Sequence, residues 1–442
     1  MRPPNLLATR WGRMTTFFFL YMSEGLPQGF AALTLATQLR RQGLSRTEVA
    51  IFTATLVAPW AWKWAMGPFI DIFSSDRFGR RRLWILVMQC MMIVTLMVAM
   101  PIDMTTSLTT LTTVMIIHNV FAATQDVAID ALACGVLQEE ERGLGNGLMF
   151  AGNWLGSGLG GSGALYLMQY TDADLSMSYC IVAGSLLLIL LFIVLPMREP
   201  KSKPTVEVEG SRWNHFQSEF TEYVTTLFSA FRNSRPAQIG ILFGLLPTGA
   251  YGLVDTLQTN LSVDFDFDDA QVATLSLASV LVTGTFCVVG GLLSDWCGRR
   301  RMLAVYVVFT AIPTLWFAYE LYQAGWITPL DPDSPNWVAP SASLIQMYWI
   351  AVLVFAVFHG LLYGTRTALF MDVCTPEVAA TQFTAYMAML NIGIIYTRAW
   401  HGYAADTWGY PVTLTIDACV GLLCIGVLPF MTKRKQSNSE PA

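Results

Sequence analysis

Apolar stretches alternate with short polar segments along almost the whole chain. Runs of roughly 20 mostly apolar residues are long enough to cross the hydrocarbon core of a bilayer as helices. Such runs lie at residues 14–36, 48–70, 83–101, 107–133, 144–168, 176–197, 236–260, 270–293, 301–322, 343–370, 381–403 and 409–431. The pattern therefore predicts an all-α polytopic membrane protein with 12 transmembrane helices.

Two longer polar segments interrupt this alternation. Residues 198–235 form a hydrophilic linker, and residues 323–342 form an insert rich in Pro and Asp. We predict an N-terminal six-helix half at residues 1–197, a cytoplasmic linker, and a C-terminal six-helix half at residues 236–442.

The composition narrows the class of protein. Hydrophobic residues make up 54% of the chain and charged residues 13%, against about a quarter charged in soluble domains. This balance excludes a soluble enzyme and an ordinary nucleic-acid binder. The eight cysteines form no CxxC pair and lie mostly in apolar runs, so we expect neither a disulfide framework nor a metal site.

The positions of the basic residues predict the orientation. Most of the 26 Lys and Arg residues lie in one set of alternate loops and at both termini. The opposite loops hold only Arg40, Arg41 and Arg46, and one of them is acidic from Asp264 to Asp269. By the positive-inside rule, both termini should be cytoplasmic.

A loop motif occurs twice in the chain. Residues 76–82 and 295–301 both read D-x-x-G-R-R-R, each after the second span of its half. The arginines alone would suit a topology signal, but the repeated Asp and Gly favour a conformational latch over neighbouring helix ends. The expected latch residues are Asp71, Asp76, Gly79, Arg80, Asp295, Gly298 and Arg299.

Other features recur at a similar offset. A Leu-Pro-x-Gly element starts at Leu26 and again at Leu246, and His118 of the fourth span is matched by His359 of the tenth. Two six-helix halves in the same orientation are the parallel repeat of the major facilitator fold. The second loop copy resembles the signature loop of that superfamily, whereas the first carries an insert before Asp76.

Ionisable residues inside membrane spans are costly and are functional candidates by default. Here they gather in spans one, four, seven and ten, which line the central cavity of the major facilitator fold. We expect residues of these spans and of spans two and eleven to line a substrate cavity: Gln28, Lys63, His118, Gln125, Asp255, His359, Gln382 and Arg398. The histidines could equally make interhelical hydrogen bonds.

Four residues are candidates for proton coupling or gating. Asp126 and Asp130 lie four apart on one helix face, which favours holding a proton on one of them. Asp130 suits a structural tie to the signature loop better, whereas Asp126 suits coupling, or a gate closed by pairing with Arg366. Glu24 is either a coupling residue or a hydrogen-bonded residue beside a helix break.

Two further elements have competing interpretations. Gly152, Gly156 and Gly160 form a G-xxx-G-xxx-G face for close helix packing. This run resembles the antiporter signature, but Ser157 replaces its proline, which weakens an exporter interpretation. The tryptophans around Lys63 are either lipid-facing anchors or a stacking surface for a sugar.

Three segments resemble the AmpG muropeptide permease branch of the peptide–acetyl-coenzyme A transporter family, within the major facilitator superfamily. They are Trp62-Lys63-Trp64-Ala65-Met66-Gly67-Pro68, Thr124-Gln125-Asp126-Val127-Ala128-Ile129-Asp130-Ala131, and Ala380-Thr381-Gln382-Phe383. The resemblance implies a proton-driven importer of anhydro-muropeptides in the bacterial inner membrane. The family's helix-four aspartates carry over to Asp126 and Asp130, and its helix-two lysine to Lys63.

The seventh span departs from that family. Where AmpG proteins carry an intramembrane Lys and Asp, this chain has Thr248-Gly249-Ala250-Tyr251 and then Asp255. A siderophore or an acyl-coenzyme A therefore remains an alternative substrate. We expect a monomeric transporter, not an enzyme, that acts on a small molecule and protons within a lipid bilayer, without cofactor, metal or nucleic acid.

Overall fold

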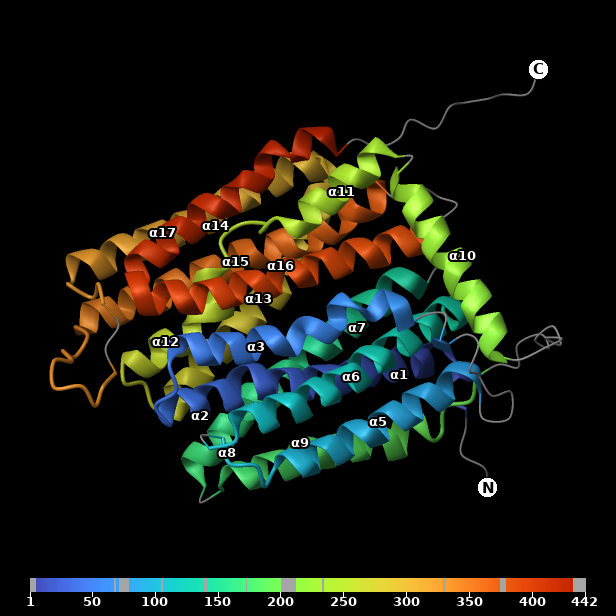
Figure 1. Cartoon of the computed structure of the whole chain (residues 1–442), viewed down its shortest axis with the longest axis horizontal. Helices are drawn as coiled ribbons and strands as arrows, with labels where there is room; N and C mark the ends of the chain where they lie inside the picture. Colours follow the sequence, from blue (N-terminus) through green and yellow to red (C-terminus); the bar gives the residue numbers. More distant parts are fainter. Residues whose placement is uncertain are drawn as a thin grey trace.

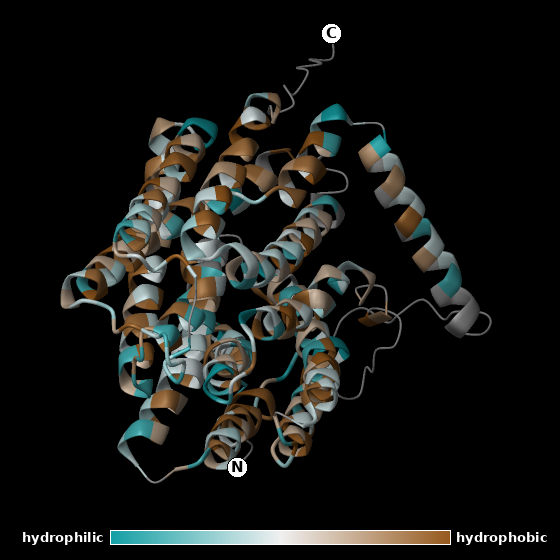
Figure 2. Ribbon diagram, turned by 60° about the vertical axis from the view of Figure 1, so that its left-hand side comes forward, coloured by the Kyte–Doolittle hydropathy of each residue, from teal (hydrophilic) through white to brown (hydrophobic). Residues whose placement is uncertain are grey.

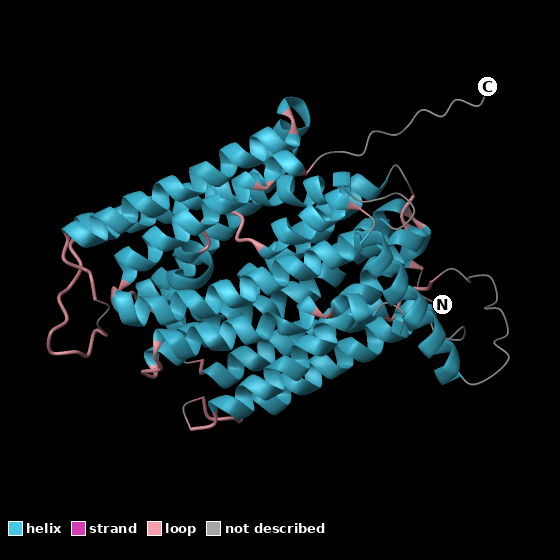
Figure 3. Cartoon of the chain, turned by 45° about the horizontal axis from the view of Figure 1, so that its top comes forward, coloured by secondary structure: helices cyan, strands magenta, loops and turns pink. Residues whose placement is uncertain are grey.

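The computed structural model describes residues 5–66, 69–70, 79–104, 106–138, 141–171, 173–199, 212–232, 234–328, 331–373 and 379–431. Within these ranges the chain forms helices joined by short connections, and no strand occurs (Figure 3). Each predicted span coincides with a helical unit, so the predicted all-α fold is confirmed.

Several spans of the first half consist of more than one helical piece. π-Helical segments widen the first, fifth and sixth spans, at Phe30–Leu35, Leu159–Gly163 and Leu190–Val194. The other pieces are α1 (Arg10–Gly29), α2 (Ala36–Arg41), α3 (Arg46–Ala61), η3 (Lys63–Met66), α5 (Arg80–Ala99), α6 (Leu108–Val136), α7 (Arg142–Gly158), α8 (Ala164–Tyr170) and α9 (Leu175–Ile189).

The second half has one interrupted span, the seventh. It consists of α11 (Arg235–Leu245), a non-helical stretch, the π-helix η7 (Gly252–Thr256) and α12 (Leu257–Asp264). The remaining helices are α13 (Asp269–Cys297), α14 (Arg299–Gln323), α15 (Ala342–Val373), α16 (Ala379–Trp408), α17 (Tyr410–Gly421) and the short η9 and η10 up to Phe430.

The helices lie side by side as an elongated bundle (Figure 1). The first and last described residues, Asn5 and Met431, and helix α10 (Arg212–Arg232), which lies within the linker, are at one end, which we call the proximal end. The short helices α2, α8 and α12 lie at the opposite, distal end. The first and the last span therefore begin and end on the same side, as an even number of spans requires.

The hydrophobic cores divide the helices into two groups. One core contains only residues from Leu7 to Met197. Two others draw on residues from Phe243 to Met431, with Leu165 as the single contribution from the first group. The exact boundaries of the two halves stay a prediction, but each group of helices packs mainly on itself.

The outer surface of the bundle suits lipid. Hydrophobic residues occupy much of the length of the helices (Figure 2). Large apolar side chains remain exposed in mid-helix, such as Val94, Phe192 and Ile312. Six helices of the described chain are long and apolar enough to cross a membrane: Arg80–Ala99, Leu175–Val194, Asp269–Cys287, Arg299–Gln323, Ala342–Thr367 and Tyr410–Phe430.

A glycine seam joins α1 to α7. A Cβ placed on Gly152 would come within 2.1 Å of the Phe18 carbonyl oxygen, and one on Gly160 within 1.9 Å of the Leu26 carbonyl oxygen. Such distances leave no room for any side chain, so the two backbones touch. The predicted glycine face therefore packs against the first span, within the same half.

The two copies of the repeated loop have matching backbone geometry. Gly79 precedes α5 with φ = 92°, and Gly298 precedes α14 with φ = 94°. Both values lie in the region that only glycine adopts readily. The internal repeat of the sequence is thus also a repeat of backbone conformation.

Candidate functional site

A group of charged side chains from three spans lies inside the first half. The Lys63 ammonium is 2.8 Å from Oδ2 of Asp126, which joins η3 to α6. Glu24 of α1 is 5% exposed and interacts electrostatically with Asp126, Asp130 and Lys63. We call Glu24, Lys63, Asp126 and Asp130 the first centre.

Asp130 has a different partner. The Tyr21 hydroxyl of α1 donates to its Oδ1 at 2.5 Å. The first centre therefore holds three carboxyl groups but one amine. Ionisation of all three would leave two uncompensated negative charges in a site shielded from water, and a bound proton would remove one of them.

Two of the predicted cavity residues bond to α5 instead. Gln125 donates to Gln89 of α5 at 2.9 Å, and His118 shares a 2.9 Å hydrogen bond with Thr95 of α5. Both side chains are fully buried between α5 and α6. Gln28 of α1 is exposed.

A second centre consists of Asp255, Arg366 and Arg398 from the second half. Arg398 of α16 makes a two-pronged ion pair with Asp255 of η7, with N–O distances of 2.7 and 2.8 Å. Its Nη1 also reaches the Thr53 carbonyl oxygen of α3 at 3.4 Å. This pair therefore lies where the two halves meet.

Arg366 of α15 has no carboxylate of the described residues within ion-pair distance. Its Nη1 donates to the Tyr251 hydroxyl, and its guanidinium lies 5.2 Å from the centre of the Tyr363 ring. The His359 ring lies among Tyr251, Phe355 and Tyr363, with centroid distances of 5.6–6.3 Å. An aromatic lining thus surrounds one guanidinium.

The break in the seventh span positions Tyr251 and Asp255. Proline at 247 and Gly249, with φ = 86°, end the helix, and neighbouring helices then satisfy the free amides. Asp417 of α17 accepts from the amides of Tyr251 and Gly252, at 3.3 and 2.7 Å. The Gly249 amide donates to the Gly421 carbonyl at 3.2 Å.

His401 of α16 completes this arrangement. Its Nε2 lies 2.8 Å from Asp417, and its Nδ1 lies 3.1 Å from the Thr256 hydroxyl. Asp417 is 2% exposed and His401 is fully buried. Asp417 and His401 thus fix the start of η7, and with it the side chains that meet Arg366 and Arg398.

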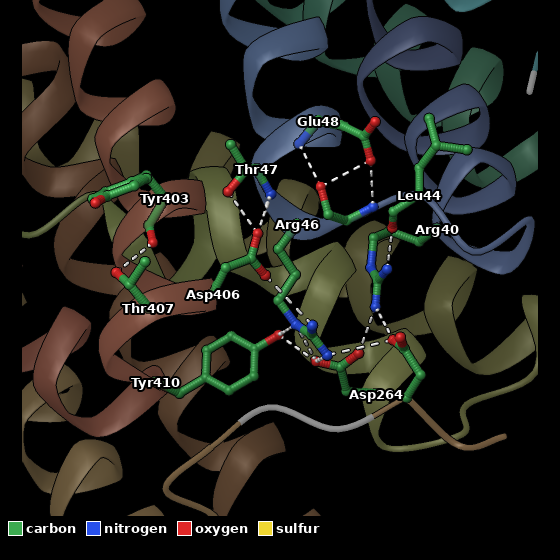
Figure 4. Close-up of polar contacts among 12 residues, drawn as sticks. Arg40, Leu44, Arg46, Thr47, Glu48, Asp264, Tyr403, Asp406, Thr407 and Tyr410 are labelled. Atoms are coloured by element: carbon green, nitrogen blue, oxygen red, sulfur yellow. Dashed lines mark hydrogen bonds and ion pairs between the residues drawn. The ribbon is translucent and has the colours of Figure 1, made fainter. Parts of the chain in front are cut away.

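At the distal end, a charge cluster ties the two halves together (Figure 4). Asp264 accepts from Arg40 at 2.8 Å, from Arg46 at 2.6 Å and from the Tyr410 hydroxyl at 2.5 Å. Asp264 and Arg40 are almost fully buried. Asp331 of the predicted polar insert lies 2.5 Å from Arg40.

Further contacts extend this distal cluster. Asp406 accepts from the Thr47 amide and hydroxyl, at 2.7 and 2.5 Å, and Arg41 pairs with Asp269 at 2.7 Å. A Cβ on Gly402 of α16 would come within 2.8 Å of the Arg46 carbonyl oxygen. The two halves are therefore in close contact at this end.

The described ion pairs of the proximal end stay within the first half. Arg13 donates to both oxygens of Glu141, at 2.9 and 2.5 Å, and holds the pKa of that carboxyl below its usual range. Arg81 pairs with Glu199 at 3.6 Å, and Arg82 donates to the Leu195 carbonyl at 2.6 Å. Thus the repeat arginines of the first half lie across the end of the sixth span.

Several other predicted residues can be placed only by their position in the chain. Asp71 and Asp76 lie outside the described residues, as does the side chain of Asp295. Gln382 is buried in α16, and Arg80 and Arg299 begin α5 and α14. The predicted Asp126–Arg366 pair is not formed in this structure, because Asp126 pairs with Lys63 and Arg366 bonds to Tyr251. Such a pair stays a prediction for another conformation.

Sequence reasoning missed the distal cluster and the support of the helix break. A signal for the first was present, since Arg40, Arg41 and Arg46 are basic residues in outer loops and acidic residues follow in the loop after Asp264. Asp417 and His401 were weaker signals: Asp417 is the single charged residue of the apolar run 409–431, whereas His401 shares its span with Arg398.

Comparison with known proteins identifies the family. The sequence model described as Major Facilitator Superfamily matches residues 14–395 and 239–442. The chain is 22% identical over 411 residues to the anhydromuropeptide permease of Escherichia coli K12, covering 90% of this chain and 75% of that one. It is 26% identical over 187 residues to the putative transporter AmpG 4 of Rickettsia conorii, covering 41% and 44%.

The fold matches as well. The inward-open xylose transporter XylE of E. coli superimposes with a TM-score of 0.70 at 12% identity, covering 97% of this chain and 98% of that one. The resemblance to the AmpG branch is confirmed, at low identity, by the curated relatives. The chain is a multi-pass membrane transporter that belongs to the major facilitator superfamily.

Proposed function

We propose that this protein imports anhydro-muropeptides across the bacterial inner membrane, coupled to protons, with both termini in the cytoplasm. The first centre carries the mechanistic part of the proposal. Glu24, Asp126 and Asp130 share one amine, that of Lys63, so protonation changes how strongly α1, η3 and α6 hold one another. The similarity to the anhydromuropeptide permease supports the substrate class.

Coupling follows from competition for Asp126. When it is ionised, its attraction to Lys63 joins the second span to the fourth at 2.8 Å. A proton on Asp126 would weaken that pair and free the lysine for an anionic solute. Protonation and solute binding would then favour the same state, which is what a symporter requires.

The distal cluster supports alternating access. Its ion pairs connect Arg40 and Arg46 of the first half to Asp264 and Asp406 of the second. With the termini in the cytoplasm, this arrangement is closed to the outside. Opening to the outside would require these buried pairs to separate, so the protein would rest in an outward-closed state.

Uptake of labelled anhydro-muropeptide into cells that lack their own permease tests the proposal. We expect accumulation that a protonophore abolishes, with the protein shown by immunoblot to be in the membrane. Accumulation that survives the protonophore would reject proton coupling. No uptake would reject the substrate, and efflux from preloaded cells would reject the direction.

One observation favours a second candidate substrate. The seventh span lacks the family's intramembrane lysine, and its Tyr251 and Asp255 instead meet Arg366 and Arg398. An amphiphilic anion such as a siderophore or an acyl-coenzyme A would also suit two guanidinium groups. Protonophore-sensitive uptake of labelled acetyl-coenzyme A into right-side-out vesicles is the corresponding test.

A further inference from the structure

Arg366 differs from the other cations at the centre of the bundle. Lys63 is neutralised by Asp126 and Arg398 by Asp255. Arg366 is only 3% exposed, yet no carboxylate among the described residues lies within ion-pair distance of it. It is a buried positive charge without a counter-ion.

Its three nitrogens have different surroundings. Nη1 donates to the Tyr251 hydroxyl, and Nε is fully buried without a hydrogen-bond partner. Nη2 makes no hydrogen bond with the described residues, and it is not among the fully buried polar atoms. The accessible part of the guanidinium is therefore the edge that the protein leaves unused.

Such an arrangement costs free energy unless an anion completes it. Arginine stays charged at all physiological pH values, so it cannot escape burial by losing its proton. An unpaired buried charge is strongly destabilising, and a neutral tyrosine hydroxyl compensates only part of that cost. The planar guanidinium is suited to two parallel hydrogen bonds from a carboxylate.

The aromatic neighbours of Arg366 connect it to the junction of the two halves. Tyr363, over whose ring Arg366 lies, packs edge-on against Trp154 of α7, with ring centroids 6.2 Å apart. Tyr251 belongs to the seventh-span break that Asp417 and His401 fix. Arg366 thus lies beside two tyrosines of its own half, one of which contacts an aromatic residue of the other half.

We propose that Arg366 binds a carboxylate of the transported solute, and that Tyr251 orients the guanidinium for it. This inference rests on the proposed function, because a muropeptide carries carboxylates on its peptide. The aromatic side chains Trp154 and Tyr363 would pack beside the same group. The competing role is a gate, in which Asp126 becomes the partner of Arg366 in another conformation.

The test compares two forms of one ligand on the purified full-length protein. Anhydromuramyl tripeptide is used with free carboxylates or with all carboxylates amidated, and binding is measured by thermal-shift titration in detergent. In the wild type the free acid should bind about tenfold to a hundredfold more tightly than the amide. In Arg366→Gln the two forms should bind equally, both as weakly as the amide.

A matched control is available on the same half. Arg235→Gln removes an exposed guanidinium at the start of α11, outside the second centre, so the preference for the free acid should remain. Tyr251→Phe should keep the preference but reduce it, since the charge remains and its orientation loosens. Melting temperatures without ligand show whether each variant is folded, and Arg366→Lys serves if Arg366→Gln is not.

The outcomes separate the inference from the proposed function. Equal binding of acid and amide by the wild type, or a preference that persists in Arg366→Gln, would overturn the carboxylate site while leaving muropeptide transport intact. If neither form binds to the wild type, the proposed substrate is rejected. The same variants are then titrated with succinyl-coenzyme A, an acyl-coenzyme A that carries a free carboxylate, where binding that does not depend on Arg366 would overturn the inference as well.

Discussion

The two charged centres of this protein have opposite compositions. The first half contributes three carboxyl groups and one amine, from α1, η3 and α6. The second half contributes two guanidinium groups and one carboxylate, from η7, α15 and α16. Sequence repeats relate the halves, yet the chemistry at the centre is not repeated.

This difference suggests a division of labour. Carboxyl groups can gain and lose protons under physiological conditions, whereas guanidinium groups cannot. A proton can therefore be handled by the first half, and a permanent negative charge on the solute can be met by the second. Four predictions test this comparison, beginning with the loss of accumulation and ending with a change in KM alone.

Asp126→Asn should abolish accumulation while leaving downhill exchange. It removes a proton acceptor, and one proton moving through 100 mV supplies about 2.3 kcal/mol, so the attainable concentration ratio should fall roughly fiftyfold. The measurement is steady-state uptake of labelled solute in energised cells. Asp174→Asn, at the exposed start of α9, is the matched control. Undiminished accumulation by Asp126→Asn would remove the first centre from coupling.

Asp264→Asn should open the distal end. The change takes a charged acceptor from Arg40, Arg46 and Tyr410, and loss of one partner of a buried pair costs about 3–5 kcal/mol. The ratio of outward-closed to outward-open protein should fall by at least about a hundredfold. The measurement is the rate at which a membrane-impermeant maleimide labels Thr53→Cys in a cysteine-free background.

Asp266→Asn is the control for this experiment. Asp266 lies in the same acidic stretch but is exposed, and its φ of 57° suits asparagine. Equal labelling rates in Asp264→Asn and the parent would show that the distal cluster does not hold the closed state.

Asp255→Asn and Arg398→Gln should each impair the second centre more than the double variant does. Either single change leaves one charge without its partner, at a cost of about 2 kcal/mol because the pair keeps some solvent exposure. The double variant removes both charges. Melting temperature and uptake are compared in all four proteins, and additive losses would mean that the two residues act independently.

Asp417→Asn should have the smallest effect. The amide keeps one oxygen acceptor for the backbone of η7 but loses the charge that interacts with His401. This loss should destabilise the folded arrangement around η7 by about 1 kcal/mol. We expect KM for the solute to rise about fivefold with little change in maximal rate. Thr415→Ala, an exposed change on the same helix, is the control, and an unchanged KM would remove Asp417 from positioning Tyr251.

The sequence was sufficient for the architecture and for the list of buried charges. Apolar runs predicted every span, and the rarity of charge within them singled out Glu24, Lys63, Asp126, Asp255, Arg366 and Arg398. Partners could not be predicted, because pairing depends on helix rotation and on conformation. Asp126 was matched by depth with Arg366, whereas in this structure η3 places Lys63 beside it.

Two other features were present in the sequence but ambiguous. Helix α10 lies within a linker that averages as polar, although Phe216, Phe220 and Phe231 recur at helical spacing. The arginines at 40 and 46 looked like exceptions to a charge rule until the fold brought Asp264 from the other half next to them. Long-range charge pairing leaves no local pattern to detect.

The glycine seam between α1 and α7 has a mechanical consequence. Backbones in direct contact have no side chains that could slide or change rotamer between them, so these two helices form one rigid unit. Glu24 belongs to this unit, and along the helix axis it lies at a level between Gly152 and Gly160. A displacement of Glu24 would therefore move the fifth span together with the first. The helix bending needed for transport must then occur elsewhere in the bundle.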